Sequence, residues 1–310
     1  MRREQGQAAA LTVLFMTVLL VSAAAVIDVG SWMREDRDTQ RAADAAALAG
    51  AQALPDDQAE AVALALDYGT KNGGGVTAND VSIESTVLQG DTISVDVDRT
   101  AGSFFAKIVG FDTVEVGSTA KARAGVPAAA QYVAPIVVNI NHPQVSCRGR
   151  GVPCFNEDAE LTLDDLHGPG TGDAAGAFGL LNLHDGGGSG APGADELSSW
   201  MSRGFDGMME PGVYRSAPSA LFNSSQMTDA LNLRSGTEVL FPIYDPPILG
   251  SGSNARYDIL GWIGFHIVDF DNRGSNGTLE GYFTRVVWKG VLSNTQTTPN
   301  FGVRTVALID

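Results

Sequence analysis

The segment DFDNRGSNGTLE, residues 269–280, carries side chains that suit calcium binding. Asp269, Asp271 and Glu280 stand at positions 1, 3 and 12 of the EF-hand loop pattern, with a glycine at position 6. Position 5 is Arg273, a cation where the pattern needs an oxygen ligand, and both flanking sequences are typical of strands. Two interpretations follow: a hairpin loop rich in glycine and asparagine, or a calcium ion held by Asp269, Asp271 and Glu280.

Two of the four histidines stand beside acidic residues. His167 lies in LDDLHGPG and His184 in LNLHDGGG. Because carboxylates can orient a ligating imidazole, a metal or acid–base site is one interpretation of these segments. The other is that both are solvated residues of glycine-rich turns. His266 lies in an apolar segment and is expected to be a hydrogen-bonded residue of a sheet.

The two cysteines are close together in the sequence. Cys147 and Cys154 are separated by RGRGVP, and in an oxidising compartment a short loop of this kind favours a disulfide. A zinc site would need two more ligands, and His142 is the only histidine nearby in the sequence. We therefore expect a disulfide between Cys147 and Cys154 in a compartment outside the cytoplasm.

Common catalytic motifs are absent from the sequence. It contains no GxSxG, no HExxH, no GxxxxGK[ST], and no GxGxxG directly after a predicted strand. We expect no catalytic residue and no cofactor, apart from the calcium alternative above.

Charge excludes one class of partner. The chain of 310 residues has a net charge of −16 and only 20 Lys and Arg residues, and it has no concentrated basic face that could neutralise phosphates. Nucleic acid is therefore not an expected partner, and the acidity is interpreted as a solvated surface.

A membrane-length apolar segment lies near the N-terminus. Residues 8–27 contain no charged side chain, and a helix of that length spans a hydrocarbon core of about 30 Å. Arg2 and Arg3 precede it, whereas acidic and basic residues are mixed from Asp28 onward. The positive-inside rule then places residues 1–7 in the cytoplasm and everything after the segment outside.

A cleaved signal peptide is the competing interpretation. Ala23–Ala25 offers the small residues that signal peptidase requires, and cleavage after Ala25 would release a secreted protein. The absence of charge before Asp28 and the helical sequence beyond it favour a retained anchor. Both interpretations place the body of the protein outside the cytoplasm.

The anchor is followed by an alanine-rich helix, QRAADAAALAGAQALP. Ala42, Ala46, Ala49 and Ala53 recur at spacings of 4, 3 and 4 residues, which places them on one helix face. Such a face lets another helix approach closely. It could pack against sibling helices or against the chain's own domain, or the alanines could simply favour the helix.

The remaining pattern predicts an α+β fold in two parts. A small α+β region is expected over residues 28–126, followed by a linker at 127–131 and a mainly β domain at 132–310. The expected elements are a long helix at 11–54, a helix at 56–68, strands at 81–87, 91–98 and 112–125, a short helix at 101–110, and two helices at 194–202 and 226–234.

The N-terminal sequence resembles a known family. REQGQ, then VIDVG, then TQRAADAAALAGAQAL, within Glu4–Leu54, is similar to the Flp pilus-assembly TadE/TadG-like family, in which an apolar span leads through D-x-G into an alanine helix. The segment FFAKIVGFDTVEVGSTAKARAG is also similar, and the second half resembles an extension of some TadG-like proteins. The position five after Gly6 is Leu11, where a prepilin has glutamate, so prepilin-type processing is not expected.

The resemblance implies an anchored, non-enzymatic component of a Tad-type (Flp) pilus or related surface apparatus. It also implies that the small α+β region at 28–126 is pilin-like. The partners of this component would be the lipid bilayer and other pilus-apparatus proteins. The alternative is an anchored or secreted hydrolase or a calcium-binding adhesive module, with its site in the glycine-rich loops of the second part.

Overall fold

The computed structural model describes residues 2–73, 75–147, 149–150, 152–163, 177–184, 190–250, 255–273, 277–295 and 298–309. It divides into two compact units. The first comprises residues 1–123 and 307–310, and the second comprises residues 124–306.

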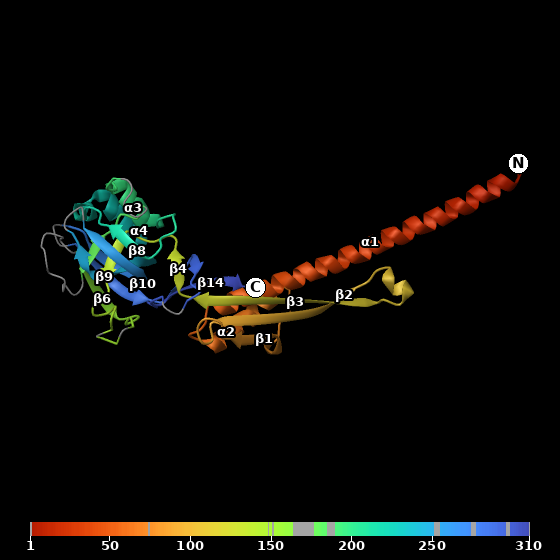
Figure 1. Cartoon of the computed structure of the whole chain (residues 1–310), viewed down its shortest axis with the longest axis horizontal. Helices are drawn as coiled ribbons and strands as arrows, with labels where there is room; N and C mark the ends of the chain where they lie inside the picture. The colour runs from red at the N-terminus through yellow and green to blue at the C-terminus, as the bar shows by residue number, and fades with distance from the viewer. Residues whose placement is uncertain are drawn as a thin grey trace. The chain divides into compact units, whose positions relative to one another are not determined.

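The order of elements confirms an α+β protein with a mainly β second part (Figure 1). The elements of the first part of the chain are α1 (Arg2–Ala51), α2 (Gln58–Lys71), η1 (Ala78–Asp80), β1 (Val81–Glu84), β2 (Thr92–Gly102), η2 (Ala106–Val109) and β3 (Thr113–Gly125). Those that follow are β4 (Pro127–Ala130), β5 (Ile136–Asn139), β6 (Asp158–Leu163), β7 (Ala177–Leu180), α3 (Ala194–Arg203), β8 (Gly212–Arg215), η4 (Ser219–Asn223), α4 (Ser225–Arg234), β9 (Glu238–Leu249), β10 (Arg256–Asp271), β11 (Thr278–Thr284), β12 (Val286–Val287), β13 (Gly290–Leu292) and β14 (Val303–Ile309).

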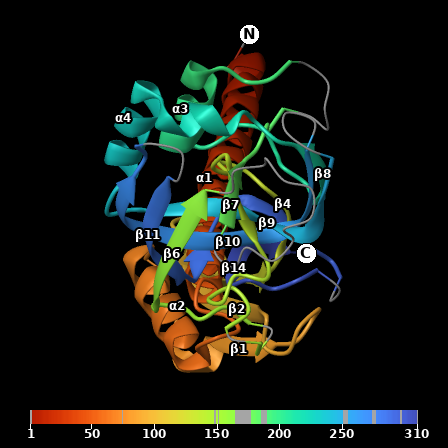
Figure 2. The same cartoon turned by 90° about the vertical axis from the view of Figure 1, so that its left-hand side faces the viewer.

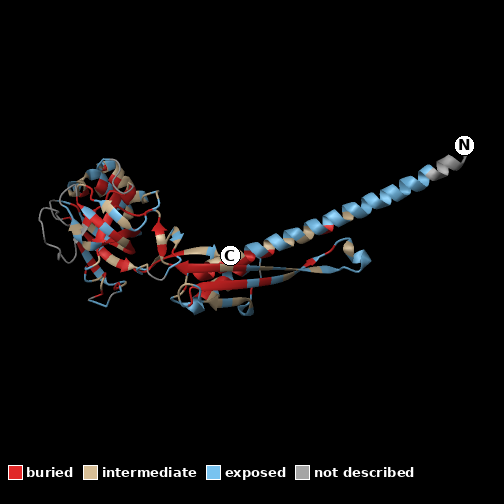
Figure 3. Ribbon diagram, in the orientation of Figure 1, coloured by how far each residue is buried: buried red, intermediate tan, exposed pale blue. Residues whose placement is uncertain are grey.

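The expected long helix is present: α1 is continuous over 50 residues, and it runs from Arg2 to Ala51 where the sequence predicts 11–54. Alanine, the best helix former, is its most frequent residue. Its first half is not packed against protein: the large apolar side chains from Leu11 to Ile27 are exposed (Figure 3). By length and composition this helix could cross a membrane, and none of its most apolar window is buried. A signal sequence would pass the same test of length and composition.

The second half of α1 forms the core of the first unit with α2 and β2. Ala42 and Ala46 are fully buried and Ala49 nearly so. Glycines let the helices approach closely, since a Cβ built on Gly50 would lie 2.7 Å from the Ala61 carbonyl oxygen. Small residues at these positions are therefore a steric requirement of the α1–α2 contact.

The sheet of this unit is built on a long antiparallel hairpin. Strand β2 pairs with β3 over its whole length and with β1 on its other edge. Alternation along β2 buries Val95 and Val97 and exposes Asp96 and Asp98. The end of β14, residues 307–309, belongs to this unit next to β3.

The second unit is built on a seven-stranded sheet with the order β11-β6-β7-β5-β9-β10-β8. Strand β10 is long enough to pair with β8 at its start and with β11 at its end, so the sheet closes on itself. Its core is aromatic, with Phe241 stacked on Phe265 and Phe265 against Phe283. Helices α3 and α4 pack side by side (Figure 2).

The expected domain boundaries differ from those of the structure. Residues 127–131 were expected to form a linker, but Pro127–Ala130 form β4, which pairs with β13. The first unit ends at residue 123 rather than 126, and the end of the chain returns to it. The sequence does not predict β4 because proline and alanine have a low propensity for strands. The strand forms because β13, far along the chain, provides its backbone hydrogen bonds.

Candidate functional site

The candidate functional site is the place where α1 is tied to the tip of the β2–β3 hairpin. Asp28 is 2% exposed, and its carboxylate accepts hydrogen bonds from three backbone N–H groups of the tip. Phe104 N lies 2.6 Å from Oδ1, and Phe105 N and Ala106 N lie 3.0 and 2.5 Å from Oδ2. The donors are the two residues before the short helix η2 and its first residue, so Asp28 caps the N-terminus of η2 from another element.

A second tie lies two turns further along the same face of α1. Glu35 Oε1 lies 3.2 Å from Arg99 Nη1 on β2, and Arg99 also donates to the Gly73 carbonyl oxygen. The alanines continue this pattern, because Asp28, Glu35, Ala42 and Ala49 are spaced by seven residues. One face of α1 thus holds the hairpin through charge near its tip and through close packing further on.

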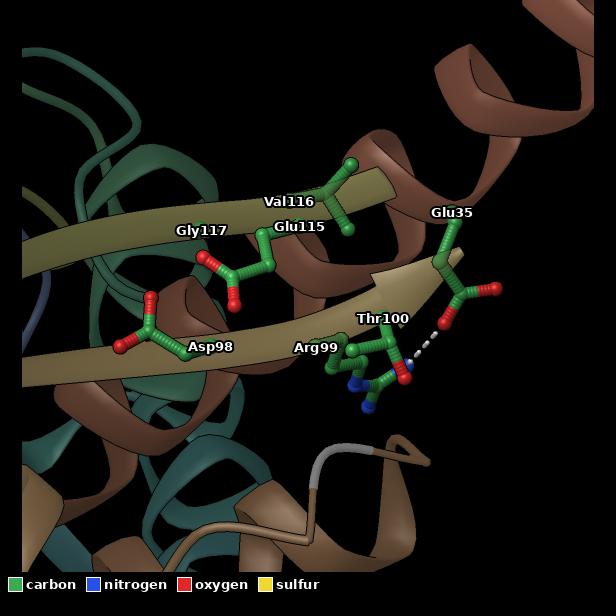
Figure 4. Close-up of a pocket in the computed structure, with 7 residues that line it drawn as sticks. All are labelled: Glu35, Asp98, Arg99, Thr100, Glu115, Val116 and Gly117. Carbon is green, nitrogen blue, oxygen red and sulfur yellow. Dashed lines mark hydrogen bonds and ion pairs between the residues drawn. The ribbon is translucent and has the colours of Figure 1, made fainter. Parts of the chain in front are cut away.

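An open hollow of about 730 Å³ lies beside this second tie. Figure 4 shows Glu35 reaching Arg99, with Asp98 and Glu115 extending from the paired strands. The hollow is lined mainly by acidic and small residues. In it the Arg99 guanidinium pairs with the Glu35 carboxylate.

The predicted alanine face lies within this arrangement. Ala42, Ala46 and Ala49 face α2 and β2 in the interior of the first unit, and Ala53 is half-buried beyond the end of the helix. Ala46 Cβ lies 3.4 Å from the position of a Cβ built on Gly69 of α2. Of the alternatives left open by the sequence, the described structure shows packing against the chain's own domain.

A comparison with known families found a match that covers most of this helix. Residues 6–53 match the Tad family, Flp pilus-assembly TadE/G-like. The match begins before the apolar segment and ends just past α1, so this TadE/G-like segment holds both the exposed apolar surface and the face that carries Asp28 and the alanines. Comparisons with curated proteins and with solved structures found no match. The match confirms the resemblance of the N-terminal sequence. The resemblances of residues 104–125 and of the second half of the chain stay predictions.

Beyond the TadE/G-like segment, a buried carboxylate organises the β1–β2 connection. Asp91 is 1% exposed and accepts from the backbone N–H groups of Thr86, Val87 and Leu88 and from the Thr92 hydroxyl. Burial raises the pKa of this carboxyl, but the hydrogen bonds outweigh it and leave the pKa lowered. The sequence does not reveal this role, because a carboxylate that binds several N–H groups has no distinctive spacing.

The expected disulfide is present. Cys147 and Cys154 are bonded, with their Cα atoms 4.8 Å apart. Glu157 lies close to the two sulfur atoms. Because the bonded sulfurs are not thiolates, this group of three does not offer a zinc site.

Reducing this disulfide should destabilise the second unit by about 2.5 kcal/mol, from the loop entropy of a short closed loop. Urea unfolding followed by tryptophan fluorescence, with and without reductant, measures the change. The double variant Cys147→Ala/Cys154→Ala is the control, and reductant should not affect it. Equal midpoints for reduced and oxidised wild-type protein, with reduction verified by alkylation, would contradict the prediction.

The predicted calcium segment forms a strand hairpin. Asp269 pairs with Glu280 across β10 and β11, and all three carboxylates are exposed. Asp269 accepts from Phe270 N and Asp271 accepts from Arg273 N, both as local backbone contacts. Gly274 lies outside the described residues. Calcium binding by these side chains stays a prediction.

The described histidines each have a neighbouring partner. His142 is buried, with Nδ1 accepting from Gln144 N, and burial lowers its pKa. His184 Nε2 lies 2.5 Å from a Glu196 carboxylate oxygen. His266, in β10, contacts the Glu238 carboxylate, as expected for a sheet residue.

The site suggested for the two acid-flanked histidines lies mostly outside the described residues. His167 and its neighbours Asp164 and Asp165 lie outside the described residues, as does Asp185. The paired site suggested by the sequence therefore stays a prediction.

Proposed function

We propose that this protein is a membrane-anchored, non-enzymatic component of a Tad-type (Flp) pilus assembly. Residues 8–27 would cross the bilayer, with residues 1–7 in the cytoplasm and the body outside. The observation that carries the proposal is that the family match covers a single helix, α1, whose two halves have different surroundings. Its first half exposes apolar side chains, and its second half is the buried core of a folded unit.

Lipid is the environment that suits the first half. The exposed side chains include Leu14, Phe15, Leu19 and Leu20, each more than half exposed. Burying one such side chain is worth about 1.5–3 kcal/mol. Leaving the apolar side chains of residues 8–27 in water on every turn of the helix is therefore strongly unfavourable. A bilayer covers this surface on all sides of the helix.

Continuity of α1 supports a structural role rather than a simple tether. The helix enters the first unit without a break and is held there by Asp28, Glu35 and the buried alanines. Because α1 is one continuous helix, a change in the position of the anchor would also move the folded unit. A component that positions other envelope proteins needs this coupling, whereas an enzyme on a flexible tether does not.

We propose no reaction because the described histidines and the buried carboxylates of Asp28 and Asp91 have structural contacts. The described histidines contact backbone groups or single carboxylates, and the Asp28 and Asp91 carboxylates bind backbone N–H groups. These are positioning roles. Other pilus-apparatus proteins would be the partners, by analogy with the family's description.

The test is a strain of the native host that lacks this chain, examined for Flp pili by electron microscopy and by the amount of pilin sheared from the surface. Loss of pili, restored by the wild-type gene, is expected. The double variant Leu14→Arg/Val18→Arg should not restore them, because arginine near the centre of the bilayer costs about 2.5–3.5 kcal/mol per residue.

The matched control is Leu14→Ile/Val18→Leu, which keeps the helix apolar and should restore pili fully. Normal piliation in the deletion strain would contradict the proposal.

A further inference from the structure

The hairpin tip, residues 103–112, exposes an unusual amount of apolar surface. Its large apolar side chains are 43% to 80% exposed, although they lie within eight consecutive residues of a folded unit. They are Phe104, Phe105, Ile108, Val109 and Phe111. Folded soluble units rarely leave such a concentrated patch in water, and its presence indicates a surface that meets something apolar.

The backbone of the tip is held by several hydrogen bonds. Ser103 N donates to the Asp112 carbonyl at its neck, and Phe111 N donates to the Ala106 carbonyl. Asp28 accepts from the N–H groups of Phe104 and Phe105, just before η2, and of Ala106, its first residue. A tip whose N–H groups are hydrogen-bonded in this way, and whose large apolar side chains are exposed, fits an apolar environment, where an unsatisfied N–H group is costly.

Asp28 also fixes the level of the tip along α1. It is the first charged residue after the uncharged segment 8–27, and α1 is continuous across this point. A helix that spans the bilayer with residues 8–27 leaves Asp28 at the outer edge of the hydrocarbon core. The hydrogen bonds from Phe104 and Ala106 therefore hold the tip at that same edge.

The apolar surface of the anchor reaches this level. Val26, Ile27 and Val29 on α1 are exposed around Asp28, so the anchor and the tip present apolar side chains at one height along the helix. Lys107 in the tip carries a positive charge suited to a lipid phosphate.

We propose that the hairpin tip is a second lipid contact, which inserts its phenylalanine, isoleucine and valine side chains into the outer interface of the bilayer beside the membrane-spanning helix. The inference rests on the proposed anchor. Interfacial segments of this kind bury apolar side chains about 5–10 Å into the headgroup boundary. The folded unit is then attached at two points, which fixes its tilt and rotation over the membrane.

The experiment uses the full chain reconstituted in vesicles of phosphatidylcholine and phosphatidylglycerol. A cysteine at the tip, Ile108→Cys, is labelled with an environment-sensitive fluorophore while the native disulfide stays oxidised. Lipids brominated in the upper acyl chain serve as the quencher. Ile108 is 80% exposed, so the label does not disturb the fold, and it should lose about half of its fluorescence in these vesicles.

The matched control is Ala59→Cys, an exposed position on α2, whose label should be quenched little. Adding Asp28→Ala to the Ile108→Cys chain should reduce quenching toward the control value, since the tip loses its tie to α1. Equal quenching at positions 108 and 59, with the protein still bound to the vesicles, would overturn the lipid contact and leave the anchor standing. Protein that does not remain with the vesicles would overturn both. Crosslinking between tips of two chains, without quenching, would assign the patch to self-association and overturn the lipid contact.

Discussion

Replacing Gly50 with valine should destabilise the first unit by about 3 kcal/mol, near the upper end for overpacking a core. The Cβ alone would lie 2.5 Å from Ile93 Cδ1 and 2.7 Å from the Ala61 carbonyl oxygen. Ile93 can shift, but the carbonyl belongs to α2, so the helices must separate. Amide hydrogen exchange in α2, measured by mass spectrometry on the detergent-solubilised chain, should become about 100-fold faster.

Gly30 on the same helix provides the matched control, because a Cβ there would have no heavy atom within 4 Å. Gly30→Ala should leave exchange in α2 unchanged and favour the helix by about 0.5–1 kcal/mol. Equal effects of the two substitutions would show that α1 does not pack on α2 as described.

Replacing Asp91 with alanine should cost about 3 kcal/mol. The change removes the acceptor for three backbone N–H groups, those of Thr86, Val87 and Leu88, at a site that is 1% exposed. A buried donor left without a partner costs about 1–3 kcal/mol, and bonds to a charged acceptor lie at the upper end. Urea unfolding monitored by exchange in β1 and β2 measures the loss.

Asp98→Ala, an exposed change on β2, is the control for the loss of one negative charge and should stay within about 0.5 kcal/mol of wild type. An Asp91→Ala protein as stable as Asp98→Ala would rule out the role assigned to this carboxylate.

The same carboxylate gives a pH dependence with a definite sign. Its pKa is lowered in the folded state, below the ordinary value of 3.8, so the unfolded chain takes up the proton first as the pH falls. The stabilisation by Asp91 is complete above pH 3.8 and disappears as the pH drops through the lower folded-state pKa. Wild-type protein should therefore lose more stability than Asp91→Ala below about pH 4, and parallel acid-unfolding curves would argue against this.

Local sequence patterns predicted the parts of the fold that local chemistry determines. Alanine and leucine specify α1, alternating valines specify β2, and the short spacing of Cys147 and Cys154 specifies their disulfide. In each case the information lies within a few residues, so inspection of one segment suffices.

The features that position the site depend on distant partners, and the sequence did not reveal them. Asp28 meets Phe104, 76 residues away, and Glu35 meets Arg99, 64 residues away. The seven-residue spacing of Asp28, Glu35, Ala42 and Ala49 was a usable signal, but the two acids were interpreted only as charges that follow an apolar segment. The closure of the second sheet through β10 and β11 is hidden for the same reason.

The central claim is that α1 remains whole and holds the protein in a membrane. The direct test is the intact mass of the protein from its native host, measured separately for membranes washed with alkaline carbonate and for the medium. The account predicts a chain in the washed membranes that still carries residues 8–27 and begins ahead of them. A soluble chain that begins at Val26 would contradict it, because signal peptidase would then have removed the apolar half of the helix.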